Sequence, residues 1–179
     1  SNYTDRLLHW FDLWTPNGDG THSAECKREG CKHVGTVECA YCDLNYGGSI
    51  YRVCQVCGGF KDTTFEPLSG VTCEAIDNGA IPRGELIVRG MANPFGNTAA
   101  DTAGLSLDNA HVTYAFTAAP EYAGKVEPFG GTVRISLPLD GIEGFKLVRA
   151  GEVESVEAPY VLENGILTFE TDATGLFLL

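Results

Sequence analysis

The sequence has no long hydrophobic run and few positive charges. No stretch of about 18 apolar residues occurs, so we expect no membrane-spanning helix. The chain carries 12 Lys and Arg against 24 Asp and Glu, a formal net charge of −12. The parts before and after Cys73 are both acidic. Because such a charge repels phosphate backbones, we expect no nucleic-acid partner.

Sequence motifs of common enzyme classes are also missing. There is no Gly-x-Ser-x-Gly elbow, no His-Glu-x-x-His helix motif and no phosphate-binding loop. Acidic pairs such as Asp101 with Asp108, or Glu121 with Glu127, are better explained as parts of a solvated acidic surface. We therefore predict that the chain is not an enzyme.

Residues 21–59 are short of aliphatic side chains, although the chain as a whole is 44% hydrophobic and should fold. Leu44, Ile50 and four valines are nearly all that this stretch contains. So few aliphatic groups cannot form a stable core of their own. The stretch should depend on a bound metal or on disulfides.

The same stretch is rich in metal ligands, since it holds six of the seven cysteines. The candidate ligands are His22, Cys26, Cys31, His33, Cys39, Cys42, Cys54 and Cys57. A Cys-x-x-Cys turn directs two thiolates to the same side, as a tetrahedral zinc ion requires, and a mixed Cys/His set suits this ion. The spacing therefore predicts one or two structural zinc ions.

The ligands can be divided between two ions in more than one way. The simplest division gives the first ion the two Cys-x-x-Cys pairs, as in a zinc ribbon: Cys39, Cys42, Cys54 and Cys57. The second ion would then take His22, Cys26, Cys31 and His33. An interleaved division joins Cys26 and Cys31 to Cys54 and Cys57, and His9 could replace one of the histidines.

Other uses of the cysteines stay open at this stage. The cysteines could form disulfides if the protein is secreted. Rubredoxin-type iron binding is compatible with the glycine after Cys57. Redox activity is less expected, because no thioredoxin-like βαβ pattern surrounds the cysteines. Cys73 lies apart and is interpreted as a buried free thiol, and His111 as a structural residue. Trp10 and Trp14 should pack against the metal loops.

From about residue 70 the composition changes to short β-type runs separated by turn residues. The predicted strands cover residues 70–76, 85–89, 111–118, 132–137, 144–149, 152–157, 166–171 and 175–179. Residues 91–104 are predicted as a long loop, and Asn164-Gly165 as a hairpin turn. We therefore predict a mainly β protein, with a zinc-ribbon-like module in residues 1–69 and an antiparallel β-sandwich in residues 70–179.

The segment Trp14-Thr-Pro-Asn-Gly-Asp-Gly-Thr-His22, with Cys26 after it, resembles a Cys/His-rich module of large surface proteins of Gram-positive, often gut-dwelling, bacteria. Those modules read W-x-x-N-G-D-G-T-H-x-x-x-C, then Cys, His, Cys and a closing C-x-x-C-G. The resemblance covers residues 9–59. Its pattern matches His22, Cys26, Cys31, His33, Cys39, Cys54 and Cys57, and does not include Cys42.

Residues 131–179 resemble β-sandwich modules of the same surface proteins, in which V-x-x-S-L-P-L precedes F-K-L-V-R and L-T-F-E-T-D. Together the two resemblances imply a noncatalytic part of a secreted or cell-surface bacterial protein, with structural zinc and a β-sandwich that serves as a spacer or binds an unknown protein. One alternative is a carbohydrate-binding accessory module, with a stacking platform built from Trp10, Trp14, Tyr46, Tyr51 and Tyr114. A zinc-ribbon nucleic-acid binder is the weaker alternative.

Overall fold

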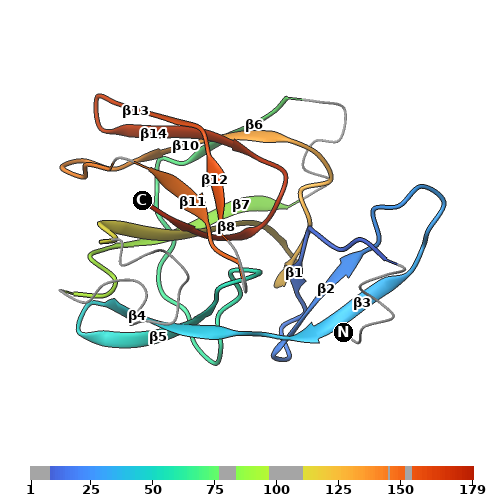
Figure 1. The fold of residues 1–179 in the computed structure, drawn as a ribbon. Coiled ribbons are helices and arrows are strands. Elements are labelled where there is room, and N and C mark those ends of the chain that lie inside the picture. Colours follow the sequence, from blue (N-terminus) through green and yellow to red (C-terminus); the bar gives the residue numbers. More distant parts are fainter. Residues whose placement is uncertain (1–8, 77–83, 97–110, 145, 152–154) are drawn as a thin grey trace.

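In the computed structural model, the described residues are 9–76, 84–96, 111–144, 146–151 and 155–179. Throughout these ranges every regular element is a β-strand, and all strand pairs are antiparallel (Figure 1). Nowhere in them is there a helix long and apolar enough to cross a membrane. The predicted fold class, a Cys/His-rich N-terminal module followed by an antiparallel β-sandwich, is confirmed.

Two sheets form the sandwich. In spatial order the four-stranded sheet consists of β13 (Tyr160–Glu163), β14 (Ile166–Thr171), β10 (Val133–Pro138) and β6 (Thr72–Ala75). The six-stranded sheet consists of β12 (Val156–Ala158), β11 (Leu147–Arg149), β15 (Gly175–Leu178), β8 (Tyr114–Tyr122) and β7 (Glu85–Ala92), with β9 (Lys125–Val126) paired to β8.

The core between these sheets follows the alternation of strand side chains. Val133, Ile135 and Leu137, which the sequence places on one face of their strand, are completely buried there. From the opposite sheet they meet Phe116 and Phe177, whose rings stack with centroids 5.2 Å apart. The two inner faces therefore interlock around aromatic side chains.

The Asn164-Gly165 pair forms the predicted hairpin turn between β13 and β14. Both residues have positive φ, 53° and 73°, as a two-residue turn of this kind requires. Glu163 pairs directly with Ile166 across the turn. The first strand of this hairpin, β13, was not among the predicted strands, because its exposed face carries Val161 and obscures the polar alternation.

A third layer covers the outer face of the six-stranded sheet. It is the hairpin of β4 (Tyr41–Tyr46) and β5 (Ser49–Cys54), visible below β7 and β8 in Figure 1. Leu44 and Val53 of this hairpin are completely buried against Ala115 and Leu176 of the sheet. Because both faces of β15 are covered, all four of its residues are buried.

The N-terminal module contributes a small sheet of its own, β1 (Thr15–Pro16), β2 (Thr21–Glu25) and β3 (Val34–Glu38). A turn at residues 17–20 joins β1 to β2, as its composition predicts. Residues 9–14 form neither helix nor strand. The domain limit at residue 69 stays a prediction, but the hairpin before that limit shares a core with the strands after it.

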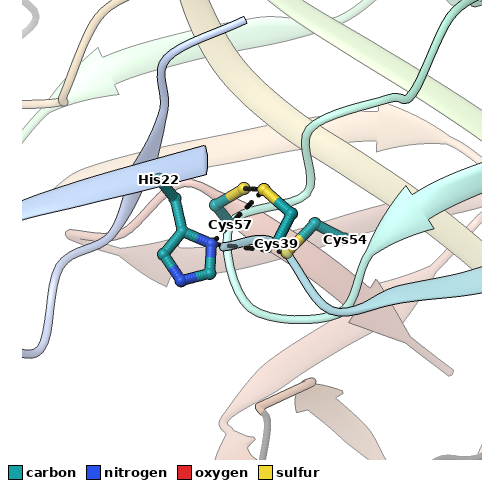
Figure 2. A group of neighbouring side chains, drawn as sticks. All are labelled: His22, Cys39, Cys54 and Cys57. Atoms are coloured by element: carbon teal, nitrogen blue, oxygen red, sulfur yellow. Dashed lines mark hydrogen bonds between the residues drawn. The ribbon is translucent and has the colours of Figure 1, made fainter. Parts of the chain in front are cut away.

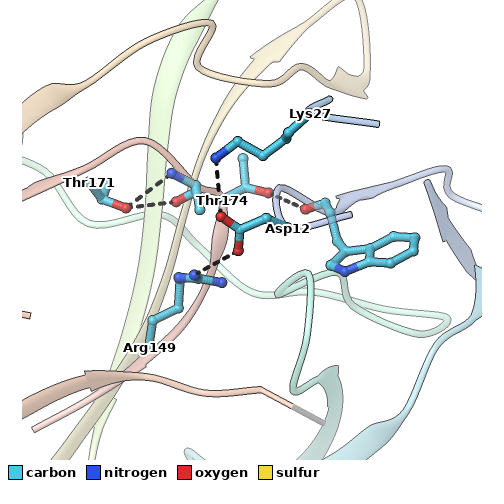
Figure 3. Close-up of polar contacts among 7 residues, drawn as sticks. Asp12, Lys27, Arg149, Thr171 and Thr174 are labelled. Atoms are coloured by element: carbon cyan, nitrogen blue, oxygen red, sulfur yellow. Dashed lines mark hydrogen bonds and ion pairs between the residues drawn. The ribbon is translucent and has the colours of Figure 1, made fainter. Parts of the chain in front are cut away.

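Polar contacts also join the N-terminal segment to the sandwich (Figure 3). The Asp12 carboxylate lies 3.2 Å from the Lys27 ammonium and 3.8 Å from the Arg149 guanidinium of β11. The hydroxyl of Thr174, a buried residue just before β15, donates a 2.9 Å hydrogen bond to the carbonyl of Trp14. These contacts fix the chain near residues 12–14 against one end of the six-stranded sheet.

Each predicted strand after residue 70 overlaps an observed one, with differences of up to a few residues at the ends. The matching strands are β6, β7, β8, β10, β11, β12, β14 and β15. Residues 152–154 of one prediction, and residues 97–104 of the predicted loop, lie outside the described residues. None of the strands before residue 70 was predicted; in β2 and β3 the side chains are mostly small or polar.

The hairpin packing predicts that Leu44→Ala destabilises the sandwich as well as the hairpin. Removal of a completely buried leucine should lower the free energy of unfolding by about 2–5 kcal/mol. Ile50→Ala on the same hairpin is the control, because Ile50 is 64% exposed and should change it by less than about 0.5 kcal/mol. Urea unfolding followed by far-UV circular dichroism measures both. A normal transition for the Leu44 variant would contradict the shared core.

Candidate metal centre

Four ligand-type side chains converge at the junction of the N-terminal sheet and the hairpin (Figure 2). They are His22, Cys39, Cys54 and Cys57, and their ligand atoms all lie within 4.8 Å of one another. His22 lies in β2, Cys39 directly follows β3, Cys54 ends β5, and Cys57 lies in the turn after it. This set could hold a metal ion.

Three distances within this group match the edges of a zinc tetrahedron. With Zn–S bonds of about 2.3 Å and Zn–N bonds of about 2.05 Å, tetrahedral angles place two sulfurs about 3.8 Å apart and a sulfur and a nitrogen about 3.5 Å apart. The Sγ atoms of Cys39 and Cys57 are 3.8 Å apart. The Nδ1 atom of His22 lies 3.5 Å from Sγ of Cys39 and 3.5 Å from Sγ of Cys54.

The turn after β5 has the backbone that such a site needs. Gly58 has a φ of 76°, which lets the chain reverse after Cys57. The N–H groups of Val56 and Gly59 then donate to Sγ of Cys54 and of Cys57, each at 3.4 Å. The turn thus leaves amide groups facing the sulfurs, and these hydrogen bonds stabilise thiolates.

The group is shielded from solvent on most sides. Cys54 and Cys57 are buried, Cys39 is half-buried, and His22 is only 2% exposed. The ring of Trp14 packs on the His22 imidazole with centroids 4.9 Å apart, which confirms the predicted packing role of this tryptophan. Burial of this kind restricts the exchange of ligands with water.

The thiols of this group differ in their ease of ionisation. Hydrogen bonding from Cys57, aided by His22 and by backbone amides, outweighs burial and lowers the pKa of Cys54 to about 3. Burial and the neighbouring Cys54 charge raise the pKa of Cys39 to about 11. The hydrogen bond with Cys54, together with burial, raises the pKa of Cys57 above its usual range. These opposite shifts make Cys54 the thiol of the group that ionises most easily.

A second group comprises His9, Cys26 and Cys31, whose ligand atoms also lie within 4.8 Å of one another. The Nδ1 atom of His9 lies 3.3 Å from Sγ of Cys31. Burial opposes ionisation of Cys26, but hydrogen bonds from the Trp10 and Arg28 backbones and from the other two members lower its pKa to about 6. This group could also hold a metal ion.

The structure corrects the ligand role predicted for Cys42. Its side chain shares the inner face of the hairpin with that of Leu44 and is 4% exposed in the core beneath the six-stranded sheet. Its thiol donates to the carbonyl of Val53 at 3.5 Å, and burial raises its pKa to about 12. The Cys39-to-Cys42 spacing does not form a metal turn because β4 begins at Tyr41 and directs Cys42 inward.

Neither predicted division of the ligands matches the two groups. His22 joins the later cysteines instead of Cys26 and Cys31, and His9 takes a place beside that earlier pair. His33 lies outside both groups, with its ring stacked on His9 at a centroid distance of 4.1 Å. The sequence suggests His9 only as a replacement ligand, since no spacing rule connects it to cysteines 17 and 22 residues away.

The remaining singled-out residues lie elsewhere. Cys73 is half-buried in β6 at the edge of the sandwich core, and His111 is exposed. Glu121 pairs with Arg89 at 2.9 Å, whereas Asp101 and Asp108 lie outside the described residues. The five aromatics of the hypothetical glycan platform are dispersed: Trp10 contacts Lys27, Tyr114 is buried, and Tyr46 and Tyr51 cluster with Phe65.

Comparison of the chain with family models, with curated proteins and with solved structures gives no match. The site must therefore be interpreted from its own geometry and chemistry.

The turn at Gly58 predicts a large effect of Gly58→Ala. An alanine with this positive φ costs about 1–2 kcal/mol, and its Cβ would lie 2.5 Å from the carbonyl oxygen of Gly175. Gly30→Ala is the matched control, since Gly30 also has a φ of 76° but nothing within 4 Å of the added Cβ. Thermal unfolding should show Gly58→Ala as clearly the less stable variant. Equal losses would mean that the contact with Gly175 is unimportant.

The unequal pKa values predict that metal binding at the four-ligand group releases about two protons at pH 7. Cys39 and Cys57 start as thiols and must ionise, whereas Cys54 is already a thiolate. Affinity for the ion should therefore rise with pH through the neutral range. Calorimetric titration of Cys26→Ser protein in buffers of different ionisation enthalpy counts the protons. Release of no protons would contradict the assignment.

Proposed function

We propose that the chain is a noncatalytic structural module of an extracellular or cell-surface bacterial protein, in which zinc bound by His22, Cys39, Cys54 and Cys57 joins the N-terminal sheet to a β-sandwich. The observation that carries this proposal is the convergence of four ligand atoms within 4.8 Å of one another, with one sulfur–sulfur distance of 3.8 Å and two sulfur–nitrogen distances of 3.5 Å that match a zinc tetrahedron.

The donor set favours zinc over other common metals. Three thiolates and one imidazole are soft or borderline ligands, which exclude calcium and magnesium and suit zinc. Iron in a rubredoxin-type site normally has four thiolates. Here the fourth ligand is the buried His22. Zinc also keeps one oxidation state, so it is compatible with an oxidising environment outside the cell.

The same geometry supports a structural rather than a catalytic ion. Catalytic zinc usually has three protein ligands and an open position for water or substrate, whereas thiolate-rich sites with four protein ligands are closed. In this chain four protein ligands are present and three of them are buried. The site thus has the ligand composition and the burial of a structural zinc site.

The position of the site shows what an ion there would hold together. His22 and Cys39 belong to the N-terminal sheet, whereas Cys54 and Cys57 belong to the hairpin packed on the sandwich. The turn at Gly58 lies directly on the Gly175 backbone at the start of β15. An ion bound by all four ligands would therefore fix the N-terminal sheet relative to the six-stranded sheet.

A spacer role for the sandwich is supported by the solvated outer face of its four-stranded sheet. On the exposed face of the four-stranded sheet, Arg134 pairs with Glu74 at 2.7 Å and with Glu170 at 3.3 Å. Such exposed pairs add little stability but keep the face solvated. The extracellular location is supported by the resemblance of the His22 and Cys54 regions to surface-protein modules. Carbohydrate binding is less supported, because the candidate aromatics do not gather in one platform.

The test compares two variants, Cys54→Ser and Cys42→Ala. The second is the control, because Cys42 is a buried cysteine outside both groups. Purified chains are analysed for zinc per chain, and backbone protection is followed by hydrogen exchange. Cys54→Ser should lose one zinc and the protection of residues 15–39, because structural zinc contributes on the order of 10 kcal/mol to small modules. Cys42→Ala should keep its zinc despite some loss of core stability. Zinc content unaffected by Cys54→Ser would refute the proposal.

A further inference from the structure

The second ligand group lies where the N-terminal segment crosses the loop between β2 and β3. His9 comes from that segment, and Cys26 and Cys31 come from the loop. The Nδ1-to-Sγ distance of 3.3 Å between His9 and Cys31 is close to the edge of a zinc tetrahedron, about 3.5 Å. All three ligand atoms lie within 4.8 Å of one another, although His9 is 17 residues from the nearer cysteine.

Backbone hydrogen bonds hold the loop in the shape that brings the two sulfurs together. The N–H of Cys31 donates to the Arg28 carbonyl at 3.0 Å, and the N–H of Cys26 donates to the His33 carbonyl at 2.9 Å. The N–H of Trp10 donates to Sγ of Cys26 at 3.4 Å. An amide directed at a sulfur is typical of the outer shell of a thiolate metal site.

The N-terminal segment is attached differently along its length. Near residues 12–14 it is fixed by the ion pairs of Asp12 and by the hydrogen bond from Thr174 to the Trp14 carbonyl. Nearer to His9, a 2.8 Å hydrogen bond runs from the Lys27 N–H to the Trp10 carbonyl, and Phe11 packs over Gly35. Exposed ion pairs contribute at most about 1 kcal/mol each. A cross-link at His9 would add a constraint at residues 9–11.

We propose that His9, Cys26 and Cys31 bind a second zinc ion, separate from the four-ligand site, which attaches the N-terminal segment to the β2–β3 sheet. Two thiolates and one imidazole suit zinc, and water can occupy the fourth position of such a site. Because this ion would have three protein ligands instead of four, it should exchange more easily than the ion at the four-ligand site. The proposal does not depend on the four-ligand site, which uses other residues.

The test measures zinc per chain in the full chain and in His9→Ala and Cys31→Ser variants. The unchanged protein should hold two ions, and each variant should hold one. The matched controls are His111→Ala and Cys73→Ser, which change an exposed histidine and a cysteine outside both groups, and both should keep two ions. Hydrogen exchange should show lost protection near residues 26–33 in the two site variants, with residues 41–54 unaffected.

Cobalt substitution gives a second readout in the unchanged protein, so it does not require any variant to fold. Sulfur-to-cobalt charge-transfer absorption scales with the number of thiolates, so the four-ligand and three-ligand sites should contribute in the ratio three to two. Titration with a chelator should remove the weaker, two-thiolate signal first.

Three results would overturn the second site. The first is that His9→Ala and Cys31→Ser both retain two ions. The second is that the unchanged protein holds one ion, which only Cys54→Ser removes, and the third is a disulfide between Cys26 and Cys31 in the purified protein. The second of these would leave the four-ligand site intact. Loss of an ion in Cys31→Ser but not in Cys54→Ser would instead refute the proposed function and support the second site.

Discussion

The arrangement of the N-terminal half depends on the convergence of one imidazole and three sulfurs from separate strands. His22 reaches the group from the small sheet, and Cys54 and Cys57 reach it from the end of the hairpin. Without a cation, thiolates at these distances repel one another, and the thiols resist ionisation. A bound divalent ion reverses that balance, because each ligand then gains a bond and the mutual repulsion is neutralised.

The hairpin of β4 and β5 connects this site to the rest of the protein. Its inner face contributes Leu44 and Val53 to a core shared with the six-stranded sheet, and its C-terminal end continues directly into the metal turn. The register of the hairpin therefore determines where the sulfurs of Cys54 and Cys57 lie. Gly58 completes the connection, since its backbone lies against Gly175 with no room for a side chain.

This arrangement explains how a segment with few aliphatic residues can be part of a stable β protein. The hairpin obtains a hydrophobic core from the sandwich, whereas among the described residues the sheet of β1, β2 and β3 has no buried cluster of comparable size. We propose that bound metal stabilises this sheet instead. We infer that the two candidate ions would have different structural roles. One joins the small sheet to the hairpin, and the other attaches the N-terminal segment to the small sheet.

The sequence by itself determined the mainly β class, most strands after residue 70, the Asn164-Gly165 turn and the residue types of the candidate metal ligands. These features depend on local alternation, turn chemistry and short spacing. Only the tertiary structure decided that Cys42 faces the core, that His22 joins Cys39, Cys54 and Cys57, and that His9 meets Cys26 and Cys31. The reason is that ligand grouping depends on how distant strands pack, and a spacing pattern carries no information about which faces of two strands will meet.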